Sequence, residues 1–226
     1  MSTAATARLR PVHMGSMSVD SERRADGTLV LRARGALPAY PRSIVDRLRH
    51  WAEAAPDRIF LADRGPDGAW RTVTYRETLD RVRALAQALL AYDLSAERPI
   101  AILSGNSLEH GLLALAAMTI GVPIAPVSPA YSQVSKDHAK LRHIFDLVTP
   151  GMVFVAEGAP FAAALGAVMK PGMTLVSVRD FAGGFDTVDF ADLLATTPTD
   201  AVEADDDRVG PDTIAKFLFT SGTTGS

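Results

Sequence analysis

Four short runs without a single charged residue constrain the fold of this chain more than any other feature. They occupy residues 99–103, 122–127, 152–156 and 174–178. Segments with helical patterning separate them, so strand and helix alternate along the sequence. Strands free of charge are typically buried on both faces, and this alternation is typical of a mostly parallel sheet covered by helices. The sequence therefore predicts an α/β fold.

Capping residues predict where two early helices begin. Ser43 can cap a helix that runs to about Glu53, and Thr74 can form a capping box with Glu77. In the helix that follows Thr74, the apolar residues step by three and four, which predicts one stripe that faces the core. The stripe consists of Leu79, Val82, Ala86 and Leu89.

Later helices are predicted from the same signals. Either Asn106 or Ser107 caps a helix rich in leucine and alanine, which is apolar on nearly all sides and should be buried. Gly121 ends this helix. Ser135 is predicted to open another helix, which Pro150 closes. The remaining predicted helices span residues 160–169 and 187–194.

The remaining strands and the domain boundaries follow from turn residues. Residues 58–63 and 70–73 are predicted to be two strands joined by a turn, and residues 214–219 to be the last strand. Residues 1–39 are interpreted as an N-terminal extension, partly disordered, with one short strand over 28–34. Residues 40–226 are expected to form one large but partial domain.

Charge and cysteine content exclude several classes of protein. With 23 basic and 26 acidic residues the net charge is −3, which argues against a basic nucleic-acid-binding surface. The absence of cysteine excludes disulfides, thiolate metal sites and cysteine nucleophiles. It is compatible with a reducing cytoplasm, where we expect the protein. The N-terminus lacks the apolar core of a secretory signal. Residues 110–135 are uncharged, but Gly121 and three prolines favour a buried helix and strand over a membrane span.

Several other residues were weighed as sites and favour a structural role. His110 is expected to be a satisfied core histidine, and His138 and His143 are five apart, which does not align them on one helix face for a metal. The acidic run at 203–207 is interpreted as a solvated loop rather than a Mg²⁺ or Ca²⁺ site. The two tryptophans are expected to be packing residues: Trp51 and Trp70.

A loop of hydroxyl-bearing residues and glycines follows the last predicted strand. It consists of Thr220, Ser221, Gly222, Thr223, Thr224, Gly225 and Ser226. Glycines allow backbone N–H groups to converge on an anion, and the hydroxyls add neutral donors, one of which can reach Mg²⁺. This composition is typical of phosphate binding, and a polar surface turn is the alternative. The loop lacks the Gly-Lys-Ser/Thr ending of a Walker A motif.

Residues 219–225 resemble the phosphate-binding signature of the adenylate-forming superfamily, which comprises acyl-CoA synthetases, luciferases and peptide-synthetase adenylation domains. Further segments resemble that superfamily in order and spacing: Val73–Glu77, Gly105–Ser107, Gly121–Val127 and Pro129–Tyr131. The resemblance covers residues 40–226. Within the superfamily, residues 102–110 and 135–141 are most similar to bacterial feruloyl-CoA synthases, which are ligases of hydroxycinnamic acids in phenylpropanoid degradation.

The resemblance implies a two-step ligase reaction. A carboxylate attacks the α-phosphorus of Mg·ATP to give acyl-AMP and pyrophosphate, and the thiolate of coenzyme A then displaces AMP. It also implies that the loop holds the β- and γ-phosphates, through hydroxyls from Thr220, Ser221, Thr223 and Thr224 and close backbone approach at Gly222 and Gly225. Thr224 is the candidate Mg²⁺ contact. The expected partner is a small carboxylic acid, with no nucleic acid and no membrane span.

The chain also departs from the superfamily pattern. In the superfamily the loop continues through proline and lysine, and the adenine, ribose, Mg²⁺, acyl and catalytic-lysine positions lie further on. The resemblance therefore implies an incomplete N-terminal domain, cut just past the phosphate loop, that alone does not catalyse adenylation and contains no catalytic residue. Two other classes stay open: a non-catalytic α/β module that binds a nucleotide or partner protein, and, last in rank, a P-loop phosphotransferase.

Overall fold

A computed structural model describes residues 18–36, 38–180 and 183–220 of the chain. It divides into two compact units, Met1–Tyr40 and Pro41–Ser226. The described part of the first unit is an antiparallel hairpin of β1 (Val19–Arg23) and β2 (Leu29–Ala33). The strand predicted over 28–34 is thus present as β2. Its partner β1 escaped prediction because its sequence, VDSER, is mostly polar. The rest of the predicted disorder, in residues 1–17, lies outside the described residues.

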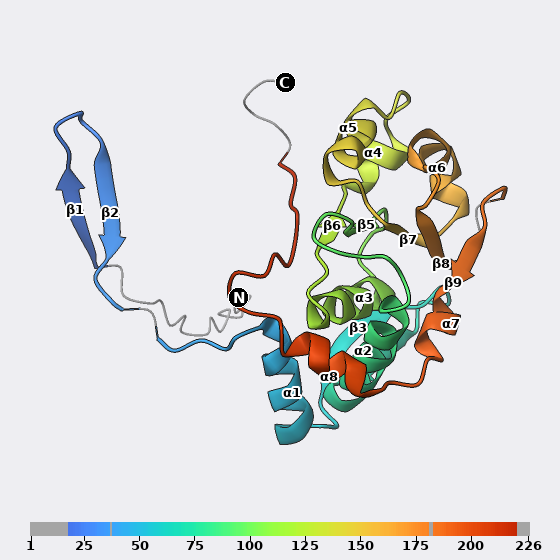
Figure 1. Ribbon diagram of the computed structural model, residues 1–226, viewed down its shortest axis with the longest axis horizontal. Helices are drawn as coiled ribbons and strands as arrows, with labels where there is room; N and C mark the ends of the chain where they lie inside the picture. The colour runs from blue at the N-terminus through green and yellow to red at the C-terminus, as the bar shows by residue number, and fades with distance from the viewer. Residues whose placement is uncertain (1–17, 37, 181–182, 221–226) are drawn as a thin grey trace, which may run out of the picture. The chain divides into compact units, whose positions relative to one another are not determined.

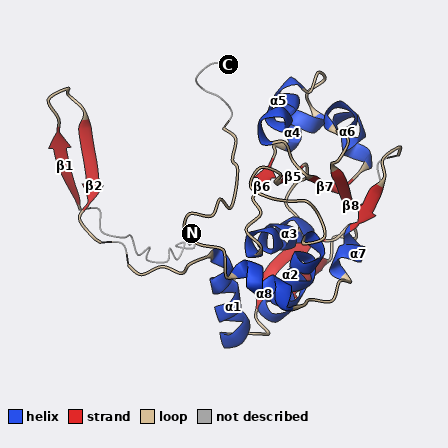
Figure 2. Cartoon of the chain, viewed as in Figure 1, coloured by secondary structure: helices blue, strands red, loops and turns tan. Residues whose placement is uncertain are grey.

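The centre of the second unit is a parallel sheet of five strands in the order β6-β5-β7-β8-β9 (Figures 1 and 2). The strands are β5 (Ile100–Ile102), β6 (Ile124–Pro126), β7 (Met152–Glu157), β8 (Thr174–Arg179) and β9 (Thr187–Asp189). All four adjacent pairs are parallel. Each of the four charge-free runs coincides with one of these strands, to within two residues at either end, and the predicted α/β fold is confirmed.

Alternate residues of the central strands enter two separate hydrophobic clusters. In β5, Ile100 and Ile102 belong to one cluster, whereas Ala101 and the next residue, Leu103, belong to the other. All four are fully buried. Because side chains alternate across a strand, a run that is apolar at every position is buried on both faces of the sheet.

Five helices pack around the first cluster (Figure 1). They are α1 (Ile44–Ala54), α2 (Tyr75–Leu89), α3 (Leu108–Thr119), α7 (Phe190–Leu194) and α8 (Asp200–Asp206). Both predicted early caps are confirmed: the Ser43 hydroxyl accepts the Asp46 N–H at 3.3 Å, and the Thr74 hydroxyl accepts the Glu77 N–H at 3.2 Å. No residue of α3 is exposed, as its composition predicted.

The other face of the sheet lies under three helices and a short 3₁₀ turn. These are α4 (Pro129–Gln133), α5 (Ala139–Val148), η1 (Ala159–Phe161) and α6 (Ala162–Val168). The helix predicted to open at Ser135 begins four residues later. The Ser135 hydroxyl accepts the N–H of His138, and His138 has the left-handed φ of 50°, so regular helix starts only beyond it.

Two further sequence predictions are corrected. Thr187 begins strand β9 rather than capping a helix, and the side chain of Asp189 caps α7 by accepting the Ala191 N–H at 2.9 Å. The acidic run at 203–207 is not a solvated loop, because it forms most of α8, and Asp206 is only 3% exposed. Periodicity could not reveal this burial, since the cations that compensate it are distant in sequence: Arg42, just before α1, and Arg49 on α1.

The predicted hairpin is present as β3 (Ile59–Arg64) and β4 (Trp70–Thr74), paired antiparallel. The two tryptophans do make packing contacts, but at the surface rather than in the core. Trp51 lies 6.1 Å from the Tyr75 ring and is 39% exposed. Trp70 lies under the guanidinium of Arg64 at 4.3 Å and is 61% exposed.

The last predicted strand, 214–219, is reduced to a single parallel bridge between Ile124 and Lys216. Two backbone bonds hold it: Ile124 N–H donates to Ala215 at 3.2 Å, and Phe217 N–H donates to Ile124 at 2.9 Å. The bridge extends the sheet beyond β6 by one short segment. Among the described residues, no helix is long and apolar enough to cross a membrane.

Candidate ligand-binding cleft

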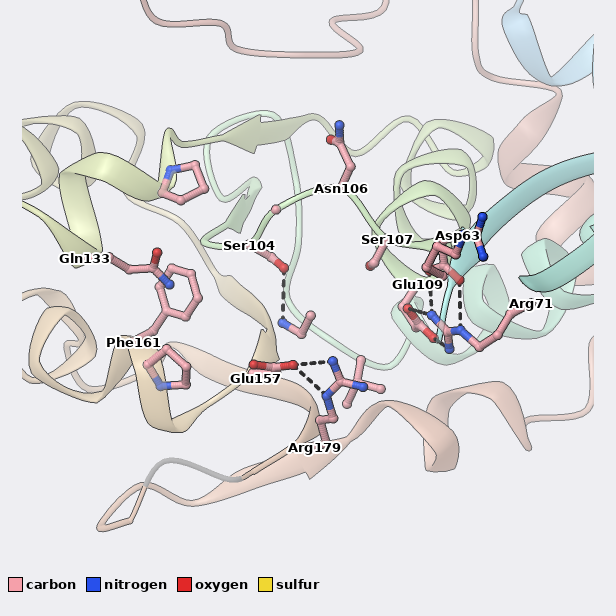
Figure 3. Close-up of a pocket in the computed structure, with 16 residues that line it drawn as sticks. Asp63, Arg71, Ser104, Asn106, Ser107, Glu109, Gln133, Glu157, Phe161 and Arg179 are labelled. Atoms are coloured by element: carbon pink, nitrogen blue, oxygen red, sulfur yellow. Dashed lines mark hydrogen bonds and ion pairs between the residues drawn. The ribbon is translucent and has the colours of Figure 1, made fainter. Parts of the chain in front are cut away.

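A cleft of about 620 Å³ opens where β5, β7 and β8 end. Residues that directly follow or end these strands line it, including Ser104 after β5, Glu157 at the end of β7 and Arg179 at the end of β8. The carboxyl edge of a parallel sheet is where α/β folds place their ligands. Figure 3 shows side chains from the sheet, from the β3–β4 hairpin and from α3 and α4 around this space.

One side of the cleft is an ion network centred on Arg71 (Figure 3). Its guanidinium binds Asp63 through Nε at 2.8 Å and Nη2 at 2.5 Å, and binds Glu109 through Nη1 at 2.7 Å. Asp63 also accepts the N–H of Leu108 at 3.1 Å, at the first turn of α3. The network therefore joins the β3–β4 hairpin to the N-terminus of α3.

These contacts set the charge state of both carboxylates. Burial acts to raise the pKa of Asp63, but hydrogen bonds from Arg71 and the Leu108 N–H outweigh it and hold the pKa below its ordinary value. The pKa of Glu109 is likewise lowered, because the Arg71 hydrogen bond outweighs burial. The hydrogen bonds to Glu109 and Asp63 raise the pKa of Arg71 further. All three groups are charged at neutral pH.

The other side carries a second pair, in which Nε of Arg179 donates to Glu157 at 2.8 Å. Arg179 and Glu157 come from the ends of neighbouring strands, and Figure 3 shows the pair apart from the Arg71 network. Among the described residues, the acidic and basic side chains that line the cleft are three arginines and three carboxylates: Arg64, Arg71, Arg179, Asp63, Glu109 and Glu157. Arg71 and Arg179 are paired with carboxylates, and Arg64 donates to the Gly68 carbonyl at 2.7 Å, so each of these guanidinium groups already has a partner within the chain.

The loop from Ser104 to Ser107 supplies the neutral polar groups of the cleft. The Ser104 hydroxyl accepts the Ala156 N–H at 3.3 Å, and the Ser107 hydroxyl accepts the His110 N–H at 3.1 Å as the cap of α3. Of the two predicted cap residues, Ser107 rather than Asn106 caps α3. Asn106 is exposed and free to turn its amide toward a ligand.

His110 is half-buried, with its Nδ1 facing the Gly105 carbonyl at 3.3 Å. Burial lowers its pKa, and the Gly105 contact only partly opposes this. The ring is therefore neutral at physiological pH. Its backbone and ring contacts are those of a structural histidine, but it is half-buried and not part of the core in which the sequence placed it.

Of the predicted phosphate loop, only Thr220 falls within the described residues, where it is exposed. Ser221, Gly222, Thr223, Thr224 and Gly225 lie outside them. Thr220 is not among the residues that line the cleft. The parallel bridge at Lys216 does fix the local direction of the chain, which runs with the strands toward their carboxyl ends four residues before Thr220.

The charged residues of the cleft were not identified from sequence. Asp63 and Arg71 face each other across the β3–β4 hairpin, whereas Glu109 is distant in sequence and its pairing with Arg71 depends on the packing of the hairpin against α3. Glu157 and Arg179 did carry a usable signal, because each is the first charged residue after a charge-free strand. Within the described ranges no group of three His, Asp or Glu side chains could hold a metal ion, so the Mg²⁺ prediction rests on Thr224 alone.

The family model for AMP-binding enzymes matches residues 48–226. The chain belongs to the AMP-binding enzyme family. Among curated proteins, it is 30% identical over 155 residues to 4-coumarate–CoA ligase-like 9 of Arabidopsis thaliana, a match that covers 68% of this chain and 25% of the relative. It is 31% identical over 186 residues to a salicylyl-CoA synthase / salicylate adenylyltransferase of a Streptomyces species, covering 79% and 32%.

Solved structures of this family share the fold. The N-terminal subdomain of Klebsiella oxytoca NpsA, in complex with 3-hydroxyanthranilyl-AMSN, matches with a TM-score of 0.56 at 21% identity, over 82% of this chain and 39% of that one. The fatty acyl-adenylate ligase from L. pneumophila, in complex with acyl adenylate and pyrophosphate, matches at 0.56 and 18% identity, over 80% and 28%. The chain spans about a quarter to a third of the length of the two curated relatives named above.

Proposed function

We propose that this chain is part of an ATP-dependent acid–thiol ligase. The observation that carries the proposal is the match of the AMP-binding enzyme model across residues 48–226, which extends through the predicted phosphate loop. In the first step a carboxylate oxygen bonds to the α-phosphorus of ATP as the bond to pyrophosphate breaks. In the second, the thiolate of coenzyme A bonds to the acyl carbon and AMP leaves. Both steps need the phosphate charge to be held in place.

The phosphate-binding residues in this proposal are Thr220, Ser221, Gly222, Thr223, Thr224 and Gly225. Hydroxyls and backbone N–H groups would bind the β- and γ-phosphates, and the Thr224 hydroxyl would contact Mg²⁺. The ion pairs of the cleft support placing the phosphates at the loop, because Arg71 and Arg179 each bind a carboxylate of the chain itself. Residues 1–226 alone would not complete the reaction in this proposal, because the matches cover only 25% and 32% of the two named relatives.

The acid is proposed to be ferulate or a related hydroxycinnamate. Residues 102–110 and 135–141 support this assignment through their similarity to feruloyl-CoA synthases. The names of two relatives refer to hydroxylated aromatic acids, 4-coumarate and salicylate. The ligand named in the NpsA complex is also built on such an acid.

The test is ATP–pyrophosphate exchange by the complete gene product and by residues 1–226, with ferulate, p-coumarate, caffeate, benzoate and acetate. We expect exchange with the hydroxycinnamates in the complete protein, a CoA thioester when coenzyme A is added, and no exchange by residues 1–226. Preference for acetate would contradict the substrate assignment. Nucleotide binding without exchange for any acid in the complete protein would instead favour the non-catalytic module.

The phosphate loop is tested by Thr223→Ala, with Thr72→Ala as the matched control. Thr72 is an exposed threonine on β4 and is not part of the predicted loop. Loss of one hydrogen bond to a charged phosphate should raise the KM for ATP about tenfold in Thr223→Ala. The control should retain the wild-type KM. Thr224→Ala should shift the Mg²⁺ concentration needed for half-maximal exchange upward, and an unchanged requirement would remove Thr224 as the metal contact.

A further inference from the structure

The segment that leads to the predicted phosphate loop is held by side chains far from it in sequence. This connector, residues 207–216, runs from the end of α8 to the Lys216 bridge. Figure 1 shows α8 beside α1 and α2, with the connector continuing from it. The connector contains no helix or strand of its own, so its path depends on what anchors its two ends.

The first anchor is Arg42, just before α1. Its Nη2 donates to the Asp206 carboxylate at 2.7 Å and to Asp46 at 3.1 Å. Its Nη1 donates to two backbone carbonyls, of Asp206 and of Val209, the latter at 3.0 Å. One guanidinium therefore binds both the last residue of α8 and the backbone of the connector.

Arg49 completes this arrangement from the next turns of α1. Its Nη1 donates to the same Asp206 oxygen at 2.7 Å. Asp206 is buried, whereas Arg42 and Arg49 are about one-third exposed. A buried carboxylate is strongly unfavourable without its cations, so these arginines stabilise the packing of the α8 end against α1.

The connector is also fitted against the end of α3. Gly121 has φ of 71°, and a Cβ built there would lie 3.6 Å from side-chain carbons of both Val209 and Thr213. Val209 is itself buried. Within the connector, the Thr213 hydroxyl accepts the Gly210 N–H at 2.9 Å, which closes a tight turn before the Lys216 bridge. Between the Arg42 contacts and the bridge, the connector has little freedom to shift.

We propose that Arg42 is a positioning residue for adenylation, which acts by fixing the connector and hence the point at which the chain enters the phosphate loop. The expected effect on catalysis rests on the proposed function, whereas the positioning itself rests on the Arg42 contacts. A displacement of about 1 Å in a group that orients a reacting phosphate can lower a rate about a hundredfold. The second step, attack by the thiolate on acyl-AMP, does not involve pyrophosphate and so does not need this positioning.

The test compares the two half-reactions in the complete gene product. The variants are Arg42→Ala and the milder Arg42→Lys, which keeps the charge but cannot reach two carbonyls and two carboxylates together. Arg83→Ala is the matched control, because Arg83, on α2, pairs with Glu203 of α8 and has no hydrogen bond to the connector backbone among the described residues. We expect pyrophosphate exchange to fall about tenfold or more in the Arg42 variants. Thioester formation from supplied acyl-AMP should change less than about twofold.

Hydrogen exchange gives a readout that needs no activity. The N–H groups of Phe217 and Ile124, which hold the bridge, should exchange about tenfold faster in Arg42→Lys than in wild type. The Leu103 N–H, which donates to Phe154 in the central sheet, should not change. An equal acceleration at Leu103 would indicate general destabilisation and overturn the inference.

The remaining outcomes separate this inference from the proposed function. A parallel fall of both half-reactions in the Arg42 variants, or a fall of the same size in Arg83→Ala, would overturn the positioning role. An unchanged hydrogen-exchange rate at the Phe217 N–H would overturn the positioning role by itself, whatever the activity. A wild-type protein that forms no acyl-AMP with any acid would overturn the proposed function instead, and with it the catalytic consequence of Arg42.

Discussion

The ion network of Arg71 gives a specific prediction for the free energy of unfolding, because it joins one cation to two carboxylates that are less exposed than it is. The perturbation is Arg71→Ala, which leaves Asp63 and Glu109 without their shared cation. The side chains of these carboxylates are 21% and 13% exposed, and that of Arg71 is 41% exposed. Removing one partner of a buried pair costs about 3–5 kcal/mol, whereas an exposed pair contributes at most about 1 kcal/mol. The intermediate exposure predicts a loss of about 2 kcal/mol in the free energy of unfolding.

For a chain of this size, about 1 kcal/mol corresponds to about 2–4 °C in Tm, so Arg71→Ala should lower Tm by about 4–8 °C at pH 7. The control is Lys170→Ala, which breaks the exposed pair with Asp146. It should cost no more than about 0.5 kcal/mol. In a Glu109→Gln background, Arg71→Ala should cost about half as much as it does alone, because the two contacts share one guanidinium.

The pH dependence gives the result that would refute this reasoning. The folded-state pKa values of Asp63 and Glu109 lie below their ordinary values of 3.8 and 4.5. Their contribution to stability is therefore complete above the unfolded pKa and is lost as pH falls through the folded pKa. The Tm difference between wild type and Arg71→Ala should be constant above about pH 5 and shrink below about pH 4. A difference that stays the same, or grows, in acid would show that Arg71 acts through packing rather than charge.

Two further predictions concern single positions. Gly151→Ala should destabilise the chain by about 1–3 kcal/mol in chemical unfolding, because the new Cβ would lie 3.0 Å from the Asp93 carbonyl and from a Leu94 methyl group. Gly166→Ala, at a helical glycine with nothing within 4 Å of a new Cβ, is the control and should be neutral or stabilising. The His110 ring should titrate by NMR with a midpoint below the ordinary 6.5, so its contribution to stability is complete above that pH and declines as pH falls; a midpoint above 6.5 would contradict its burial.

Much of the fold could be predicted from the sequence because its signals are local. A cap needs only one residue, Ser43, and a capping box only two residues three apart, Thr74 and Glu77, which is why the starts of α1 and α2 were correct. The failures came where a local signal competed with a distant one. Ser135 has the side chain of a helix cap, but the left-handed His138 follows it and α5 begins only at Ala139. Thr187 likewise resembled a cap, yet it pairs with β8 as part of β9.

The sequence by itself determined the α/β class, the family resemblance and the chemistry predicted for the loop at 220–225, because each depends on residue type at short spacing. Only the tertiary structure decided that Asp206 is buried rather than solvated, and that Arg42 reaches both its carboxylate and the connector backbone. These two residues are separated by more than 160 positions. The favourable energy of such a contact depends on the burial and geometry of both partners, which no local pattern encodes.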